Sequence, residues 1–154
     1  MSHVATNRAY WNGMAHEWVA GGERLWALET PTWGIWATPD REAPLLPADM
    51  TGMDAIELGC GTAYVSGWMA RRGARVTGID ISDKQLATAR RLADAHSAEI
   101  TLIEGDAEAT GLPDASFDFA VSEYGAAIWC DPQVWLREAH RLLRPGGTLA
   151  FLGN

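Results

Sequence analysis

The sequence predicts an α/β protein with a parallel sheet and helices on both of its faces. From residue 54 onward, short apolar segments with strand character alternate with segments of helical periodicity, the order typical of parallel sheets. Residues 1–50 differ, because they contain five of the eight tryptophans and four of the seven prolines. We therefore divide the chain into an N-terminal helical, Trp-rich cap segment, residues 1–50, and a sheet-containing domain, residues 51–154.

The cap segment is expected to begin with one amphipathic helix, from about Ala5 to Ala20. Gly21-Gly22 is predicted to end this helix. Between residues 30 and 49 the prolines favour short turns, with Thr38-Pro39-Asp40 as a possible helix start.

Three helices are predicted between the strands of the second domain. Tyr64–Arg72 is helical and stops at Gly73, and a second helix is capped by Ser82, with Gln85 at the capping-box spacing. A third helix starts at Asp131-Pro132, runs through Leu143 and ends at residues 144–147. Five strands alternate with these helices, and right-handed crossovers place the first one centrally, in the order 3-2-1-4-5. The predicted strands are Ala55–Leu58, Arg75–Asp80, Ile100–Glu104, Phe117–Ser122 and Thr148–Leu152.

Composition and charge argue against several classes of function. The net charge of −8, without a basic stripe, argues against nucleic acid and anionic membranes as partners. Cys60 and Cys130 have no metal-type spacing, so we expect no metal site and two reduced thiols. The N-terminus lacks signal-peptide features, and the longest uncharged stretch, 13 residues from Leu58, is too short to span a bilayer. A cytoplasmic protein is expected.

Three features fall at the carboxyl ends of successive predicted strands. They are the turn Gly59-Cys60-Gly61, the acid Asp80 and the acid Asp106. Singly, each also suits a structural role, as a tight turn, a helix cap or a turn residue. Together they form one wall of a crevice, because open parallel sheets bind ligands at this edge. The crevice suits a nucleoside, with its ribose on Asp80 and its base toward Asp106.

Two residues beside the glycine turn indicate which nucleoside ligand it binds. In the dinucleotide fingerprint G-x-G-x-x-G the last glycine would fall at Tyr64, which is bulky. Glu57, at the end of the preceding strand, would repel a pyrophosphate and favour an ammonium group, directly or through water. The turn therefore suggests a nucleoside with a cationic tail and no phosphate.

Four segments carry a resemblance to a known family: AIELGCGTA, VTGIDIS, IEGDAEATGLPDASFDFAVS and EAHRLLRPGGTLAFL. The stretch from Asp54 to Leu152 resembles the class I S-adenosylmethionine-dependent methyltransferases of small-molecule type, similar to the ubiquinone and menaquinone methylases. The resemblance implies a Rossmann-like, doubly wound sheet. It also implies methyl transfer from S-adenosylmethionine to a small-molecule acceptor, leaving S-adenosylhomocysteine.

The resemblance also implies which residues bind the cofactor. Glu57, Gly59 and Gly61 would line its methionine end, Asp80 would take the ribose hydroxyls, and Asp106 would meet the adenine amino group. The remaining candidates lie beside these or on the N-terminal helix: Tyr10, Trp11, Cys60, Ile81, Gln85, Ala107 and Ser122.

Two departures from the family pattern are visible. Ala63 stands where the family turn has its third glycine, which is a small change if the backbone there is already helical. The family sheet ends in an antiparallel strand pair, whereas this chain ends at Asn154, just past the fifth strand. We therefore expect either a fragment of a longer protein or association with another chain, for which a second copy is the candidate. Thr148–Leu152 is then predicted to be poorly ordered or paired with that chain.

Few residues are candidates for the acceptor end of the site. Glu123 could act as base or orient the acceptor, or could only bind water or the cofactor's edge. Trp129 and His16 are candidates for the substrate pocket, and a surface position is the alternative for His16. Two other functions remain open, a non-catalytic cofactor-binding module and an NAD-dependent oxidoreductase.

Overall fold

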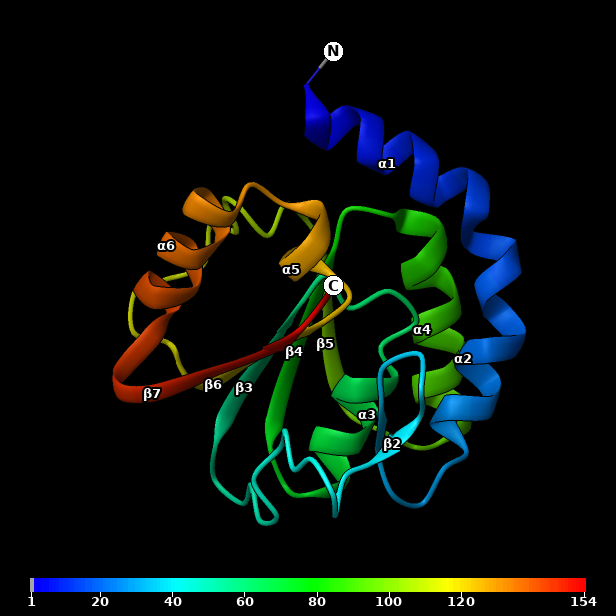
Figure 1. Cartoon of the computed structure of the whole chain (residues 1–154), viewed down its shortest axis with the longest axis vertical. Coiled ribbons are helices and arrows are strands. Elements are labelled where there is room, and N and C mark those ends of the chain that lie inside the picture. The colour runs from blue at the N-terminus through cyan, green and yellow to red at the C-terminus, as the bar shows by residue number, and fades with distance from the viewer. Residues whose placement is uncertain (1) are drawn as a thin grey trace.

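The computed structural model describes residues 2–154, and its centre is a parallel five-stranded sheet (Figure 1). The spatial order of the strands is β5-β4-β3-β6-β7, with every neighbouring pair parallel. This confirms the predicted order, in which the first strand of the domain is central. The strands are β3 (Asp54–Leu58), β4 (Arg75–Asp80), β5 (Ile100–Glu104), β6 (Phe117–Glu123) and β7 (Leu143–Leu152).

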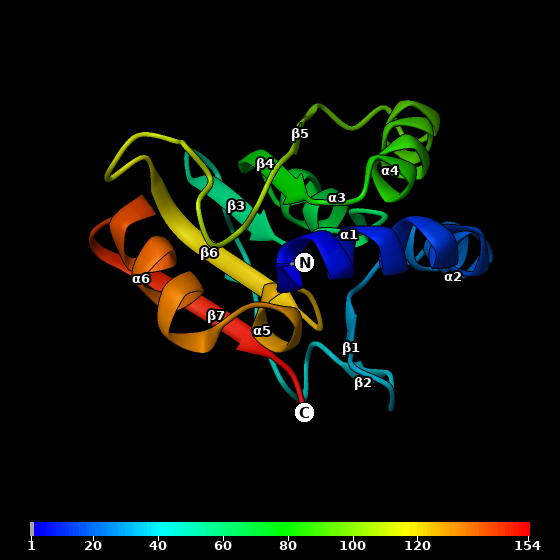
Figure 2. The same ribbon diagram turned by 90° about the horizontal axis from the view of Figure 1, so that it is seen from above.

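Helices cover both faces of the sheet, as predicted. Helices α3 (Tyr64–Arg71) and α4 (Asp83–Ala95) pack on one face, and α5 (Ala126–Trp129) and α6 (Pro132–Leu142) on the other (Figure 2). The predicted caps are present: the Ser82 hydroxyl accepts from the Gln85 amide at 3.1 Å. The Asp131 carboxylate likewise accepts from the Gln133 amide at 2.9 Å. Because β4 and β6 both run parallel to β3, their carboxyl ends lie at one edge of the sheet.

The alternation of strand side chains fills a core on each face. On the α3 side, Ala55, Val76 and Phe119 pack with Trp68, while Ile56 and Leu58 face Trp135 on the other side. Burial of large apolar side chains at about 25 cal/mol per Å² is the main favourable term here. The edge of the sheet at the carboxyl ends of the strands therefore stands on two packed cores.

The N-terminal helix is longer than predicted. Helix α1 (His3–Met14), the 3-10 helix η1 (Ala15–Trp18) and α2 (Val19–Trp26) follow one another without a break, so Gly21-Gly22 does not end the helix. Packing overrides the low helix propensity of glycine, because a Cβ on Gly22 would lie 2.8 Å from the Thr62 hydroxyl. Four residues later, the buried indole of Trp26 donates to the Thr62 carbonyl.

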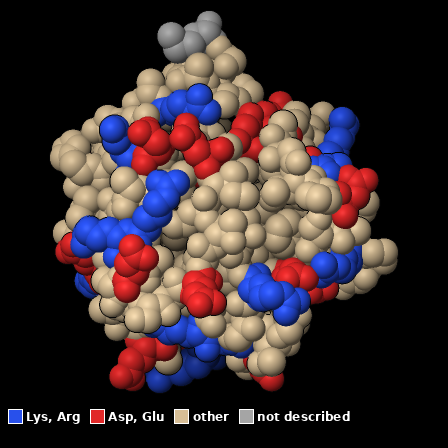
Figure 3. Space-filling view, turned by 180° about the vertical axis from the view of Figure 1, so that it is seen from behind, with Lys and Arg blue, Asp and Glu red and all other residues tan. Residues whose placement is uncertain are grey.

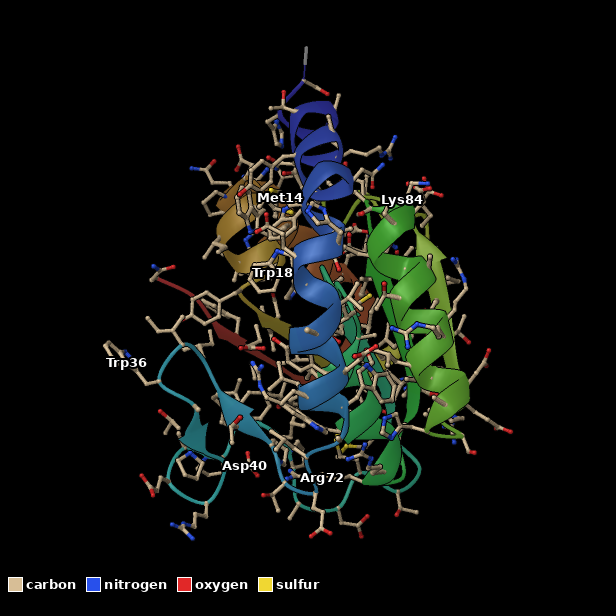
Figure 4. The ribbon with its side chains drawn as sticks, turned by 90° about the vertical axis from the view of Figure 1, so that its right-hand side faces the viewer. Met14, Trp18, Trp36, Asp40, Arg72 and Lys84 are labelled. Carbon is tan, nitrogen blue, oxygen red and sulfur yellow. The ribbon has the colours of Figure 1, made fainter. Side chains whose placement is uncertain are left out.

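A small hairpin replaces the helix start predicted at Thr38. Strands β1 (Thr32–Trp33) and β2 (Thr38–Pro39) pair antiparallel around a tight turn with positive φ at Gly34 and Ala37. The hairpin turn carries Trp36, which is 85% exposed and points away from the body of the molecule (Figure 4).

Two local expectations near the sheet are also corrected. Ala63 has φ +63°, in the left-handed region, so its backbone is not helical and the residue replaces a glycine at some conformational cost. Residues 144–147 lie within β7 instead of forming a loop, with a register irregularity opposite Phe117 and Phe119. Thr148–Leu152 pairs with β6 and is ordered. Its association with another chain stays a prediction.

Charged side chains of both signs lie on the surface. On the face opposite the viewer of Figure 1, positive and negative side chains are interspersed (Figure 3). Within residues 2–154, no helix has the length and apolar character needed to cross a membrane.

An ion pair fastens the hairpin to helix α3. The Asp40 carboxylate accepts from the Arg72 guanidinium at 2.7 Å, from the Trp33 indole at 2.9 Å and from the Leu45 amide at 3.3 Å. Arg72 also donates to the Leu46 and Pro47 carbonyls. The two charged side chains are only 15% and 19% exposed, so removing one leaves poorly hydrated partners behind.

We expect Asp40→Ala to lower the free energy of unfolding by about 2–3 kcal/mol, because three donors lose their acceptor. Urea unfolding followed by far-UV circular dichroism measures this. The control is Arg41→Ala, whose side chain is 85% exposed, and it should change stability by less than about 0.5 kcal/mol. Equal effects of the two substitutions would contradict the assigned role of Asp40.

Candidate functional site

A cavity opens at the carboxyl ends of β3, β4, β5 and β6, and helix α1 contributes to its lining. Its floor is the glycine turn after β3, and its roof comes from α1 and α5. The residues that line it come from both parts of the chain: His3, Val4, Asn7, Trp11, Trp18, Glu57, Gly59, Cys60, Gly61, Thr62, Tyr64, Ile79, Asp80, Ile81, Gln85, Gly105, Asp106, Ala107, Glu108, Glu123, Tyr124, Gly125, Ala126, Trp129 and Cys130.

The turn Gly59-Cys60-Gly61 is glycine-rich for a steric reason. Gly59 has φ +75°, and a Cβ there would lie 2.6 Å from the backbone nitrogen of Ala126. The amides of Gly59 and Cys60 both donate to the Ile79 carbonyl at 2.9 Å. These bonds fix the turn against the end of β4.

The Asp80 carboxylate is held by backbone amides. Its Oδ2 accepts from the Gly61 amide and its Oδ1 from the Ser82 amide, each at 2.8 Å. Burial raises the pKa of Asp80 despite these donors. A carboxylate has about four lone-pair sites, so each oxygen can still accept one bond from a ligand in the cavity.

Glu57 is a buried acid with all its described bonds on one oxygen. Oε1 accepts from the Ser66 amide at 3.0 Å and from its hydroxyl at 2.7 Å. Burial raises the pKa of Glu57 to about 8, more than these hydrogen bonds lower it. Because no lysine or arginine lines the described part of the cavity, a cationic ligand group would favour the ionised form.

Two more polar groups complete this end of the cavity. Asp106 accepts from the Glu108 amide at 2.8 Å, which orients its carboxylate after β5. Gln85 lines the cavity from α4, and its buried Oε1 is the one buried side-chain polar atom within residues 2–154 without a hydrogen-bond partner. Such an atom costs about 1–3 kcal/mol unless a ligand supplies a donor.

Glu123 occupies the other end of the cavity. Its Oε2 accepts from the Tyr64 hydroxyl at 2.5 Å, and its Oε1 accepts from the Gly34 amide at 3.3 Å. Burial raises the pKa of Glu123 and holds the pKa of Tyr64 well above its usual range, so the tyrosine stays a neutral donor. The hairpin, α3 and β6 thus meet at this carboxylate.

Aromatic rings form the roof. Trp11 lies edge-on to Trp129 at 5.0 Å between ring centroids and contacts Trp18 at 5.7 Å, while Tyr10 stacks on Trp129 at 5.6 Å. Trp18 projects from the helical rod toward α5 (Figure 4). Helix α1 itself has no buried residue.

Polar contacts hold α1 across the opening. Asn7 donates to the Trp129 carbonyl at 2.8 Å, Arg8 to the Ile81 carbonyl at 3.1 Å, and the Asn12 side chain to Asp83 at 2.8 Å. At the rim His3 lies 2.7 Å from a Glu108 oxygen, and this contact raises the pKa of His3.

The structure brings most of the predicted site residues together. The lining includes Trp11, Glu57, Gly59, Cys60, Gly61, Asp80, Ile81, Gln85, Asp106, Ala107, Glu123 and Trp129. Three candidates are outside it. Tyr10 is half exposed on the roof, Ser122 is buried with its hydroxyl accepting from the Ala127 amide, and His16 is exposed, facing the Gly13 carbonyl.

Sequence reasoning did not identify several lining residues as functional. Tyr64 was noted only as a bulky residue at a glycine position, and its bond to Glu123 spans 59 residues. Trp18 lines the cavity beside Trp11, on the same face of the N-terminal helix. The two cysteines are free, as expected, and both line the cavity. Residues 2–154 contain no group of three or more potential metal ligands.

Comparisons with known proteins agree with this geometry. A family model described as "Methyltransferase domain" matches residues 56–151. The chain is 38% identical over 114 residues to malonyl-[acyl-carrier protein] O-methyltransferase of Pectobacterium atrosepticum, which covers 73% of this chain and 42% of the relative. It is 36% identical over 99 residues to demethylmenaquinone methyltransferase of Thermus thermophilus, covering 63% and 45%.

Solved structures agree with the fold. An S-adenosylmethionine-dependent methyltransferase from Mesorhizobium loti superimposes with a TM-score of 0.62 at 35% identity, over 70% of this chain and 49% of that one. The chain spans less than half the length of each of these three proteins.

The raised pKa of Glu57 makes stability depend on pH. The folded protein keeps this proton up to about pH 8, whereas the unfolded chain loses it near pH 4.5. The stabilisation is therefore complete below pH 4.5 and disappears as the pH rises to about 8. We expect the free energy of unfolding of the wild type, relative to Glu57→Gln, to fall across this window. Urea titrations of both proteins at several pH values measure the difference, and parallel pH profiles would contradict it.

Proposed function

The chain belongs to the methyltransferase domain family, and we propose that it transfers a methyl group from S-adenosylmethionine to a small-molecule acceptor. Membership confirms the predicted family and, with it, S-adenosylmethionine as the cofactor. The observation that carries the proposal is the set of acids along one cavity, Glu57, Asp80 and Asp106, each fixed by hydrogen bonds at a strand end.

The residues present fit this cofactor. Asp80 keeps acceptor sites for the ribose hydroxyls, and Asp106 would accept from the adenine amino group. Glu57, directly or through water, would face the ammonium group. Gly59 presents no side chain beneath the methionine end, and a Cβ there would meet the backbone of Ala126. The unpartnered Gln85 Oε1 offers one more acceptor on the ribose and adenine side.

The cofactor supplies an electrophilic methyl group on sulfur, so the chain mainly has to orient the acceptor and exclude water. We assign Glu123 to the acceptor end, as a base or as an orienting acceptor of hydrogen bonds. Trp129, with Trp11 and Trp18, would close this end against water. His16, exposed and outside the cavity, would reach an acceptor only if α1 and η1 moved.

Several expectations about the whole protein belong to this proposal. Residues 1–50 act as the cap over the domain formed by residues 51–154, and the protein works in the cytoplasm on a small molecule, not on nucleic acid or at a membrane. Self-association would run along β7. The named relatives act on a malonyl-acyl-carrier protein and on a demethylmenaquinone, so family membership alone selects no acceptor for this chain.

The first test is binding of S-adenosylhomocysteine, measured by titration calorimetry. We expect micromolar binding to the wild type and about 10–100-fold weaker binding to Asp80→Asn, because a neutral amide is a poorer acceptor for two hydroxyls. Asp94→Asn, an exposed acid on α4, is the matched control and should bind like the wild type. Absence of wild-type binding would refute the proposal, and binding without turnover on any acceptor would favour a cofactor-binding module. Tighter binding of NADH would favour an oxidoreductase.

Binding should also release a proton. Glu57, with a pKa of about 8, is largely protonated in the free protein at pH 7, and an ammonium group beside it favours ionisation. We therefore expect the calorimetric enthalpy at pH 7 to vary with the ionisation enthalpy of the buffer, and the dependence to shrink in Glu57→Gln. The same buffer dependence in both proteins would assign the proton to another group.

A further inference from the structure

We propose that the methyl acceptor is an amine, held as its ammonium ion by Glu123. The inference rests on the proposed function and concerns the acceptor end of the same cavity, where the hairpin, α3 and β6 meet. Its basis is the unbalanced charge of the lining and the bonds that Glu123 makes.

The cavity lining is acidic and has no permanent cation. Among the residues that the structure describes, no lysine or arginine lines the cavity. Five carboxyl groups do, those of Glu57, Asp80, Asp106, Glu108 and Glu123. Two basic side chains of helix α1 make other contacts. His3 pairs with Glu108 at the rim, and Arg8 donates to the Ile81 carbonyl. An acceptor that carries a carboxylate or phosphate would therefore enter a negative, poorly hydrated site.

Four of the five carboxyl groups have an assigned partner. Glu57, Asp80 and Asp106 face three parts of the proposed cofactor, and Glu108 is paired with His3. Glu123 remains. Both of its described bonds come from neutral donors, the Tyr64 hydroxyl at 2.5 Å and the Gly34 amide at 3.3 Å.

These two bonds orient Glu123 without balancing its charge. A buried carboxylate with only neutral donors keeps much of its desolvation cost, and a cation beside it recovers that cost. Each oxygen accepts one described bond, so an acceptor site remains on each for an incoming N–H group. Uncharged polar molecules would gain less here than an ammonium ion on an apolar stem, because tryptophan rings line the same cavity and attract cations.

The chemistry balances without a further reagent. One N–H proton of the ammonium passes to Glu123, which frees the nitrogen lone pair. That pair forms the new N–C bond to the methyl carbon as the C–S bond breaks, and the electrons of the C–S bond stay on sulfur. Tyr64 acts as a positioning residue, because its hydroxyl bond favours the ionised carboxylate that must receive the proton.

The test compares three probes with one shape and different charge: 2-phenylethylamine, 2-phenylethanol and 3-phenylpropionate. Each is titrated by calorimetry into wild-type protein saturated with S-adenosylhomocysteine, whose neutral sulfur removes the sulfonium from the comparison. We expect the amine to bind at least about tenfold more tightly than the carboxylate, with the alcohol between them. Equal binding, binding of none, or preference for the alcohol or the carboxylate would overturn the inference.

Variants then locate the selectivity. Glu123→Gln keeps the shape of the side chain and should abolish the preference for the amine. Glu104→Gln, an exposed acid at the end of β5, is the matched control and should keep the preference. Tyr64→Phe retains the ring and should reduce the preference partly, which covers the case in which Glu123→Gln does not fold. An amine preference that persists in both Glu123→Gln and Tyr64→Phe would overturn the inference.

The two proposals fail differently. If the wild type does not bind S-adenosylhomocysteine, the proposed function is refuted and the amine inference falls with it. If it binds S-adenosylhomocysteine but lacks the amine preference, only the inference about the acceptor is overturned.

Discussion

The hydrogen bond from the Gly61 amide to the Asp80 carboxylate is the constraint on which the site depends. It ties the turn after β3 to the end of β4, and Asp80 in turn accepts from the Ser82 amide at the start of α4. Backbone amides are rigid donors, so this arrangement fixes two strand ends and a helix N-terminus without relying on flexible side chains. The turn can adopt it because Gly59 and Gly61 both have positive φ. The geometry of the proposed cofactor site is therefore fixed mainly by backbone hydrogen bonds.

The acceptor end is built in the opposite way. Glu123, Tyr64 and Gly34 come from β6, α3 and the β1–β2 hairpin, and only tertiary packing brings them together. The Asp40–Arg72 pair holds that hairpin against α3, so a contact far from the cavity helps to determine where the Gly34 amide points. Substitutions in the hairpin can thus alter the acceptor end of the cavity while the cofactor end stays intact. This is one physical route by which a family that keeps one cofactor can diversify its acceptors.

The strand order and the acids at the strand ends could be predicted because their signals are local. The capping of α4 by Ser82 and the glycine turn follow from short spacings. The continuation of the helix through Gly21-Gly22 could not be predicted, because it depends on the contact between Gly22 and Thr62. The Tyr64–Glu123 bond and the hairpin depend on contacts between distant segments in the same way. The left-handed conformation of Ala63 was not predicted, because alanine is small enough to replace the family's glycine in a helical backbone as well.

Helix α1 differs from the rest of the enclosure because none of its residues is buried. Its polar attachments include hydrogen bonds from Asn7, Arg8 and Asn12, and water can replace each of them at a small net cost. The rings of Tyr10 and Trp11 add contacts with Trp129, but neither residue is fully buried. The turn below is instead packed against Ala126 and cannot yield without steric strain. Ligand exchange should therefore proceed by partial detachment of α1, with the helical rod pivoting near η1, where the hydrogen-bonding pattern changes. Helix α1 would then move while the glycine turn stays in place. The lifetime of a complex would be determined by α1, and its affinity by the turn and the strand ends.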